Sequence, residues 1–329
     1  MREGGRGESR GLIEVSDLLV PDVHAEAASP QPPHAASLER LPAKDVRLGD
    51  LKIRRVLPVR QRRVIGPWCF FDRFGPLTFA EGKPMDVAPH PHMGLQTVSW
   101  LLEGEIVHHD GLGSEGLLRP GELNVMTAGR GIAHAEETPP RHSGLLNGVQ
   151  LWVALPGPER DTDPSFQHVT SLPSLEWRGG RVTLIMGELQ GLASAAHAFS
   201  PMVGADVTVH AGERLQLPLN PGFEHAVLVL AGDGSLEGTD LEPDTLYYIG
   251  MDRDEVGLDS RAGARILLIG GVPFGEPLVM WWNFVARTPD EIELARRDWI
   301  EHRRFADVKA YRGPRLDAPP FAPHLSKPR

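Results

Sequence analysis

Cysteine is almost absent from this sequence of 329 residues, because Cys69 is the single one. An internal disulfide is therefore excluded, and a chain with so little cysteine suits a reducing compartment. Trp68 and Phe70 flank the thiol, and this setting predicts a small, buried apolar side chain and not a nucleophile.

Long apolar runs are missing as well. No window approaches the roughly 18–20 apolar residues that a membrane-spanning helix needs. Residues 1–50 also lack the apolar centre of a secretory signal. We therefore expect a cytoplasmic protein that makes no contact with a membrane.

Positive charge is in deficit, with 34 Lys and Arg against 44 Asp and Glu and a formal net charge of −10. Proteins that bind nucleic acid by neutralising its phosphates usually present a basic face. Direct binding of nucleic acid is therefore not expected.

Turn-forming residues are abundant, with 36 Gly and 30 Pro. They favour many short strands over long helices, and regular short strands predict an all-β chain of antiparallel sheets packed as sandwiches or barrels. The first series of expected strands is Ile53 to Leu57, Leu95 to Leu102, Glu105 to His109, Leu117 to Arg119, Leu123 to Thr127 and Leu146 to Leu155. The second series is Val182 to Met186, Val203 to Val209, Ala226 to Leu230, Thr245 to Ile249 and Arg265 to Ile269.

The two ends differ from this pattern. Residues 1–45 carry no sustained apolar period and predict a disordered extension. Residues 312–329 form a Pro-rich tail in which Phe321 could dock. Ahead of the tail, a helix is expected from Thr288 as N-cap, with Pro289 at the first position, Glu291 completing a capping box and a buried stripe at Ile292, Ala295 and Trp299.

The two series of strands resemble each other. The segments Leu101–Gly104 and Leu118–Gly121 have counterparts in Val229–Gly232 and Leu241–Asp244. This similarity predicts an internal duplication, with a first lobe over residues 46–165 and a second lobe, including the helix, over residues 166–311.

Two short motifs carry metal-binding chemistry. His90 and His92 are two residues apart, and so are His134 and Glu136, a spacing that puts both members of a pair on one face of a strand. Three imidazoles and one carboxylate suit Fe, Mn, Co, Ni, Cu or Zn. The pairs can share one ion if their strands are neighbours.

A single H-x-H motif is weak evidence, and a metal-free β-sandwich remains an alternative. Pro91 favours an edge strand, where a site can open to solvent, and Gly129 and Gly131 predict a tight turn just ahead of His134. Alignment of the duplicated turns carries His90, His92, His134 and Glu136 onto Pro218, Asn220, Gly257 and Asp259. The second lobe therefore lacks the set, which favours a functional role over an architectural one.

The run from His90 to Glu137 resembles the metal-binding half of the pirin family of bicupins. Asp72–Pro76 resembles the signature that precedes it in that family, and Trp281–Val285 with the helix from Thr288 resembles the end of pirin-like chains. The resemblance covers about residues 45–305. Two departures stand out, because the family often has Arg where this chain has Met93 and commonly has Glu where it has Gln96.

This resemblance implies two tandem cupin-type β-sandwich or jelly-roll lobes and one metal, usually Fe(II), held by the residues matching His90, His92, His134 and Glu136. The second cupin lobe would bind none. Some family members are similar to flavonol 2,3-dioxygenases that open quercetin with O₂ and release carbon monoxide. Others act as redox-sensitive partners of transcription regulators or metabolic enzymes.

Two functions therefore stay open. In the first, a small aromatic substrate and O₂ enter the first lobe, and Glu136 is the catalytic residue that accepts the proton of the substrate hydroxyl. In the second, oxidation of Fe(II) to Fe(III) changes the charge beside a surface that binds a protein partner.

The remaining polar candidates are not expected to be ligands. His108 and His109 point to opposite faces of one strand, and we expect them on the surface or packed behind the site. Arg130 suits a structural salt bridge as well as a substrate contact. Four further histidines show no ligand spacing: His142, His168, His197 and His210.

Overall fold

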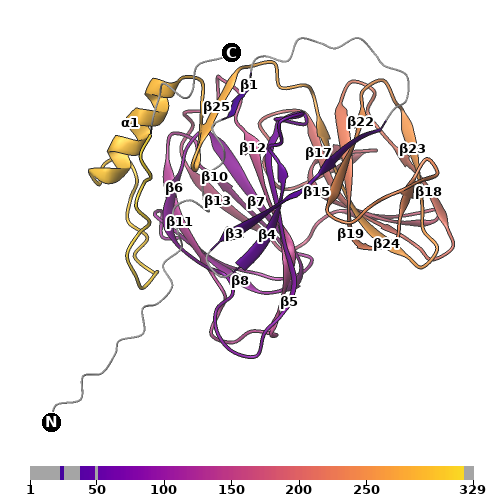
Figure 1. Ribbon diagram of the computed structural model, residues 1–329, viewed down its shortest axis with the longest axis horizontal. Coiled ribbons are helices and arrows are strands. Elements are labelled where there is room, and N and C mark those ends of the chain that lie inside the picture. Colours follow the sequence, from indigo (N-terminus) through magenta and orange to yellow (C-terminus); the bar gives the residue numbers. More distant parts are fainter. Residues whose placement is uncertain (1–22, 26–37, 49–50, 322–329) are drawn as a thin grey trace.

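The structure is a computed structural model that describes residues 23–25, 38–48 and 51–321. Two lobes of antiparallel sheet lie side by side, and one short helix flanks the first lobe on the side away from the second (Figure 1). The predicted all-β architecture with two lobes and a C-terminal helix is confirmed. No helix in this part of the chain is long and apolar enough to cross a membrane.

The first lobe is a sandwich of a seven-stranded and a four-stranded sheet. The seven-stranded sheet has the order β13 (Ser165–Val169), β10 (Leu123–Thr127), β7 (Leu95–Gly104), β12 (Leu145–Ala154), β5 (Trp68–Thr78), β4 (Leu51–Leu57) and β3 (Lys44–Leu48). The four-stranded sheet has the order β6 (Asp86–His92), β11 (Ile132–Glu137), β8 (Ile106–Asp110) and β9 (Glu115–Leu118).

The second lobe repeats this plan. Its large sheet has the order β14 (Ser174–Trp177), β15 (Gly180–Leu189), β17 (Met202–Val209), β24 (Ala264–Gly271), β19 (Glu224–Gly232), β22 (Thr245–Gly250) and β2 (Glu39–Pro42), and β16 (Leu192–Ala193) pairs with β15. Its small sheet has the order β18 (Arg214–Pro218), β23 (Glu255–Asp259), β20 (Ser235–Leu236) and β21 (Thr239–Asp240). Taken from β22 to β14, the large sheet follows the same order as that of the first lobe from β10 to β3, and the small sheets match as given. Such matching orders are expected of an internal duplication.

The two large sheets bury a shared core. Alternate residues of the first lobe, including Phe71, Val98 and Leu151, pack with Leu228 and Leu267 of the second lobe. The period of two along each strand turns one apolar face toward the other lobe and leaves the opposite face to line the interior of each sandwich. Removing this much apolar surface from water makes the two lobes one packed unit.

Two buried indole N–H groups of the first lobe find acceptors in the second lobe. The indole N–H of Trp100 donates to Asp206 at 2.7 Å, and Asp206 also accepts from Arg265 at 2.7 Å. The indole N–H of Trp68 donates to the Val203 and Gly270 carbonyls. A buried donor without a partner costs about 1–3 kcal/mol, so these bonds favour this one docking of the lobes.

The C-terminal segment returns to the first lobe. A three-stranded sheet has the order β1 (Val23–Ala25), β25 (Leu278–Trp281) and β26 (Phe284–Ala286), and α1 (Pro289–Ile300) follows it. Trp282 and Phe284 share a buried cluster with Ala133 and Ala135 of β11. This segment therefore covers the outer side of the small sheet in the first lobe.

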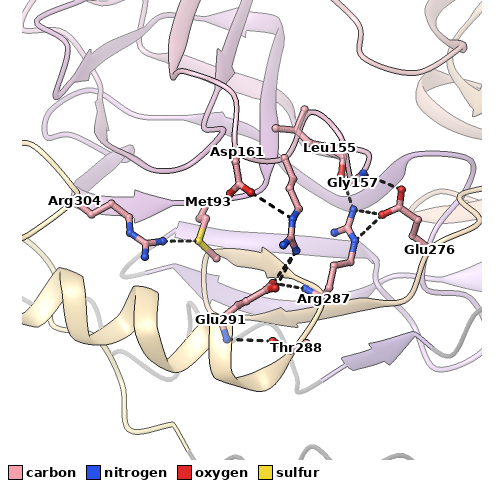
Figure 2. Close-up of polar contacts among 10 residues, drawn as sticks. Met93, Leu155, Gly157, Asp161, Glu276, Arg287, Thr288, Glu291 and Arg304 are labelled. Atoms are coloured by element: carbon pink, nitrogen blue, oxygen red, sulfur yellow. Dashed lines mark hydrogen bonds and ion pairs between the residues drawn. The ribbon is translucent and has the colours of Figure 1, made fainter.

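The helix begins as its sequence predicts, with one difference. Thr288 is the N-cap and accepts the N–H of Glu291 at 3.3 Å, Pro289 is the first residue, and the expected stripe is buried. The carboxylate of Glu291 does not return to Thr288 to complete a capping box. It accepts the N–H of Arg287 at 2.9 Å and pairs with Arg160 at 3.0 Å (Figure 2).

The same polar contacts hold the C-terminal segment to the first lobe. Arg287 donates to the Leu155 carbonyl at 2.7 Å and to Glu276 at 2.8 Å, and Glu276 accepts the Gly157 N–H at 2.8 Å (Figure 2). Leu155 and Gly157 directly follow β12. The segment is thus fastened to the loop that leaves the large sheet of the first lobe.

The predicted boundaries need correction in three places. Part of the extension expected to be disordered, residues 1–45, is ordered: β1 pairs with β25, and β2 adds an edge strand beside β22 of the second lobe. The remainder, residues 1–22 and 26–37, lies outside the described residues. Beyond the proposed division at 165, β13 pairs with β10 of the first lobe. Finally, the helix assigned to the second lobe packs on the first.

The two differences that involve strands have one physical cause. A sheet edge offers unpaired N–H and C=O groups to any nearby extended segment, whatever its local apolar period. Leu41 of β2 is 1% exposed and belongs to the core shared by the lobes. In the tail, residues 312–321 form no helix or strand, and the ring of Phe321 lies 5.1 Å from that of Trp281. Residues 322–329 lie outside the described part.

Candidate metal centre

Two paired strands bring the histidines together. β6 is the edge strand of its sheet and pairs with β11, so that His134 lies opposite His90 and Ile132 lies opposite His92. His90 and His92 point to one side because they are two residues apart on a strand. Pro91, which has no N–H to donate, lies at the sheet edge as expected.

The three rings converge. The ring centroids of His90 and His92 are 5.0 Å apart, those of His90 and His134 4.4 Å, and those of His92 and His134 4.9 Å. One nitrogen of each ring lies within 4.8 Å of the others, and all three side chains are buried. A single ion could contact all three.

Glu136 lines the same cavity and has His108 as a neighbour. A bulge between His134 and Glu136 shifts the register of β11, and Glu136 lines the cavity with the three histidines. Its carboxylate lies within 4.8 Å of nitrogens of His134 and His108. His134 therefore belongs both to this group and to the group of three histidines. Ser99 Oγ is 3.3 Å from Glu136 Oε1 and 2.7 Å from Gln150 Oε1.

The environment keeps the imidazoles neutral. Burial lowers the pKa of His90 to about 4 and lowers the pKa values of His92 and His134 well below their usual range. Burial raises the pKa of Glu136. His90 Nδ1–H donates to the Ala88 carbonyl at 2.9 Å, which leaves Nε2 with its lone pair. Neutral imidazole is the form that binds metals.

A tight glycine turn lies directly before β11, as predicted. Gly131 N–H donates to the Ala128 carbonyl at 2.8 Å, and Gly129 and Gly131 have φ angles of 50° and 146°. A Cβ on Gly129 would lie 2.0 Å from the Thr162 carbonyl oxygen. Only glycine accommodates both the backbone conformation and this approach.

A small cavity adjoins the histidines. Its volume is about 70 Å³, and both sheets of the first lobe contribute to its wall. The apolar part of the wall comprises Leu51, Ile53, Phe70, Phe74, Met85, Val87 and Trp152. The Trp152 ring stacks on Phe70 at 4.0 Å and meets His92 edge-on at 5.1 Å.

One ion pair interrupts the apolar wall. Arg55 donates to both carboxylate oxygens of Asp72, at 2.9 and 2.8 Å, and its guanidinium lies 4.7 Å from the Phe70 ring centroid. Asp72 opens the signature Asp72–Pro76. Its neighbour Arg73 points the other way and contacts the second lobe. The signature therefore serves both the cavity and the docking of the lobes.

His108 is packed behind the site, which is one of the two places that the sequence allowed for it. His108 lies opposite Glu136 in the pairing of β8 with β11 and is 2% exposed, and its Nδ1 is 3.3 Å from Nδ1 of His134. His109 points away and contacts Glu115 and Glu137. The period-two pattern already put His108 and His109 on opposite faces, but the pairing register decides which one faces inward.

Three other residues named in the sequence analysis have clear positions in the structure. Arg130 is exposed and forms an ion pair with Asp163, in agreement with a structural salt bridge. Gln96 donates to Thr127 and to the His197 carbonyl, so it faces the second lobe and does not orient an imidazole. Beside Met93, the Arg304 guanidinium lies 3.1 Å from the Met93 sulfur and brings a basic group to the position where Arg was missing (Figure 2).

The second lobe offers no equivalent set. Among the described residues, the groups of His, Cys, Asp or Glu that could hold an ion lie in the first lobe. The strands equivalent to β6 and β11 are β18 and β23, and Pro218 and Gly257 lie on them. The Pro218 ring offers no ligand atom, and Gly257 has no side chain.

Comparison with known proteins identifies relatives that span both lobes. The family model described as Pirin matches residues 50–153, and the model of the pirin C-terminal cupin domain matches residues 204–306. The predicted pair of cupin lobes is thereby confirmed. A Pseudomonas aeruginosa protein with the provisional name quercetin 2,3-dioxygenase is 44% identical over 292 residues, which span 88% of this chain and 92% of that protein.

One further relative is named pirin, and one similar crystal structure is named quercetin 2,3-dioxygenase. Pirin of Rattus norvegicus is 33% identical over 257 residues, covering 75% of this chain and 86% of the relative. The crystal structure of quercetin 2,3-dioxygenase from Acinetobacter baumannii superposes with a TM-score of 0.85 at 40% identity, covering 88% of this chain and 98% of that one. Similarity thus extends over both lobes.

Proposed function

This chain belongs to the pirin family, and we propose that its first lobe is the metal centre of a dioxygenase that cleaves flavonol-type, quercetin-like substrates with O₂. In this proposal His90, His92, His134 and Glu136 bind Fe(II). The observation that supports it is the convergence of three neutral imidazoles and a carboxylate on one largely apolar cavity.

The donor set fits a divalent transition metal. Three imidazole nitrogens and a carboxylate oxygen suit iron, and the same donors accept Mn, Co, Ni, Cu or Zn. Buried nitrogens without a hydrogen-bond partner among the described residues include His92 Nδ1 and His134 Nε2. Such atoms are costly unless something binds them, and an ion contacting His134 Nε2 would remove that cost.

Glu136 is the proposed catalytic base. When bound, the ion would supply Lewis acidity that lowers the pKa of the substrate hydroxyl. Glu136 accepts that proton, and its burial, which raises its pKa, makes it a stronger base than an exposed glutamate. Ser99 holds one oxygen of the carboxylate at 3.3 Å. Phe70, Trp152 and the other apolar residues of the wall exclude water.

The size of the cavity sets a condition on this function. Pockets for small-molecule ligands usually measure about 300–1,000 Å³, whereas this cavity measures about 70 Å³. A flavonol therefore requires side chains of the wall to move. Met85, whose side chain is unbranched and has three rotatable bonds, is the apolar residue of the wall with the most rotamer freedom.

The narrow cavity also favours a second function, an iron-based redox sensor that binds a transcription factor or a metabolic enzyme. Such a sensor needs access for electrons and small oxidants but no room for an aromatic substrate. Oxidation of Fe(II) to Fe(III) adds one positive charge at the site, and this charge acts on nearby surface contacts.

Metal analysis joined to a turnover assay separates the two functions. Protein loaded anaerobically with Fe(II) is mixed with quercetin, exposed to air, and followed by loss of flavonol absorbance and release of carbon monoxide. The same assay is run on His92→Ala and on His210→Ala. His210 is exposed and lies in the second lobe, so its substitution controls for a general effect of losing a histidine.

Turnover that requires His92 and tolerates loss of His210 supports the dioxygenase. Turnover that survives His92→Ala refutes the catalytic assignment. Bound iron without turnover favours the redox sensor, and absence of any bound metal refutes both functions.

A further inference from the structure

His108 has both ring nitrogens engaged directly behind a proposed metal ligand. Its Nε2 lies 3.2 Å from Asp110 Oδ2, and its Nδ1 lies 3.3 Å from His134 Nδ1. The ring stacks on Phe166 with centroids 4.2 Å apart and planes 1° from parallel. His108 and Asp110 are 2% and 3% exposed, so water does not compete for these contacts.

The positions of the protons follow from the acceptors. A carboxylate only accepts hydrogen bonds, and Asp110 also accepts the backbone N–H groups of Leu112 and Ser114 at 2.9 Å each. The Nε2 of His108 must therefore carry the proton that it donates to Asp110. Neutral His108 then has a lone pair on Nδ1.

That lone pair determines the tautomer of His134. Two facing ring nitrogens cannot both carry a proton, so His134 Nδ1 is the donor and His108 Nδ1 the acceptor. The lone pair of His134 consequently lies on Nε2. This is the atom that is buried without a partner among the described residues.

A direct ligand role for His108 is disfavoured by the same contacts. Its nitrogens lie within 4.8 Å of donor atoms of His134 and Glu136, but one is occupied by Asp110 and the other faces the His134 ring nitrogen. To bind an ion itself, His108 would have to give up one of these bonds and the stacking on Phe166.

We propose that Asp110 and His108 form a positioning relay, in which the carboxylate fixes the tautomer of His108 and His108 fixes that of His134, with its Nε2 lone pair turned to the metal. The inference rests on the proposed metal site. Ligating histidines commonly donate their second N–H to an acceptor, and removing that acceptor typically costs 10–100-fold in metal affinity.

Asp110→Asn tests the relay because it should invert the proton order. The amide oxygen can keep the bonds from Leu112 and Ser114, while the amide N–H₂ faces His108 Nε2 and forces it to accept. His108 Nδ1 then carries the proton and donates a hydrogen bond to His134 Nδ1, so the single proton of neutral His134 lies on Nε2. We expect Fe(II) affinity, measured anaerobically by chelator competition, to fall 10–100-fold.

His108→Phe supplies the matched variant, since it keeps a ring on Phe166 and removes both nitrogens. In this background Asp110→Asn should cost less than twofold more, because the carboxylate no longer acts through a histidine. Additive losses would mean that Asp110 is merely structural and would overturn the relay. His109→Gln, which changes the neighbour that faces Glu115 and Glu137, should leave the affinity within twofold.

A measurement without metal keeps the two proposals separable. The ¹⁵N shifts of His134 in metal-free protein report which nitrogen carries the proton. A proton on Nδ1 in the wild type and on Nε2 in Asp110→Asn supports the relay. A proton on Nε2 in the wild type overturns it, whether or not iron binds or quercetin is consumed.

Discussion

Arg73 of the first lobe forms an ion pair with Asp244 of the second, with 2.9 Å between Nη1 and Oδ1. The guanidinium is nearly buried and also donates to the Leu230 carbonyl at 2.7 Å. Arg54 pairs with the same carboxylate at 3.1 Å, but its side chain is 31% exposed. Asp244 thus forms ion pairs with one buried and one half-exposed arginine.

Arg73→Ala should lower the free energy of unfolding by about 2–4 kcal/mol, because it leaves Asp244 and the Leu230 carbonyl short of a donor at the lobe interface. Arg54→Ala removes a solvent-screened pair and should cost below about 1 kcal/mol. Urea unfolding of both variants measures the difference. Equal losses would show that the burial of Arg73 has no energetic consequence.

Cys69 should be inert in the native protein. The thiol is fully buried, and burial raises its pKa to about 12, so thiolate is scarce at pH 8. We expect no labelling by a thiol reagent in native buffer and complete labelling in guanidinium chloride. Rapid labelling of folded protein would contradict this prediction.

His225 should make stability depend on pH. The side chain is 1% exposed, and burial lowers its pKa from 6.5 to about 4. The unfolded chain therefore binds the extra proton between these values, so the stabilising contribution is present above about pH 6.5 and is lost as the pH falls toward 4. The loss is of the order of 2–3 kcal/mol.

His225→Asn isolates this contribution, because the other histidines are common to both proteins. The free energy of unfolding should decrease less for the variant than for the wild type between pH 7 and pH 4.5, whatever the cost of the substitution at neutral pH. Parallel pH profiles would refute the assignment.

Met85→Ala should enlarge the cavity beside the histidines. If a flavonol enters there, kcat/KM for quercetin should rise roughly tenfold, since one pocket group changes discrimination by about 1–3 kcal/mol. Met126→Ala is the control, because Met126 is also buried but does not line the cavity. Each substitution should cost about 2–5 kcal/mol of stability. A rise in both variants would point to loosening of the fold and not to space for the substrate.

Local patterns in the sequence were sufficient to predict eleven of the 26 described strands and the helix. Alternation and turn residues located β7, β10, β12 and the five central strands of the second lobe, and the Thr288 cap located α1. The pairs His90–His92 and His134–Glu136 fall on adjacent strands, as their spacing allowed.

Long-range pairing could not be predicted in the same way. β2 has little apolar pattern and is ordered by the edge of β22, and α1 packs on the lobe farther away in sequence. His108 and Gln96 illustrate the same limit within the site. Their faces depend on which strand lies opposite, and register is a property of the folded sheet and not of either segment alone.

The return of the C-terminal segment to the first lobe has a consequence for synthesis. A ribosome releases the strands carrying His90 and His134 long before β25, β26 and α1, whose side chains cover that sheet from outside. Until the last segment emerges, Ala133 and Ala135 face solvent, and the packing of the first lobe is incomplete. A gene cut at codon 165 would give two fragments, each lacking a strand that the other encodes.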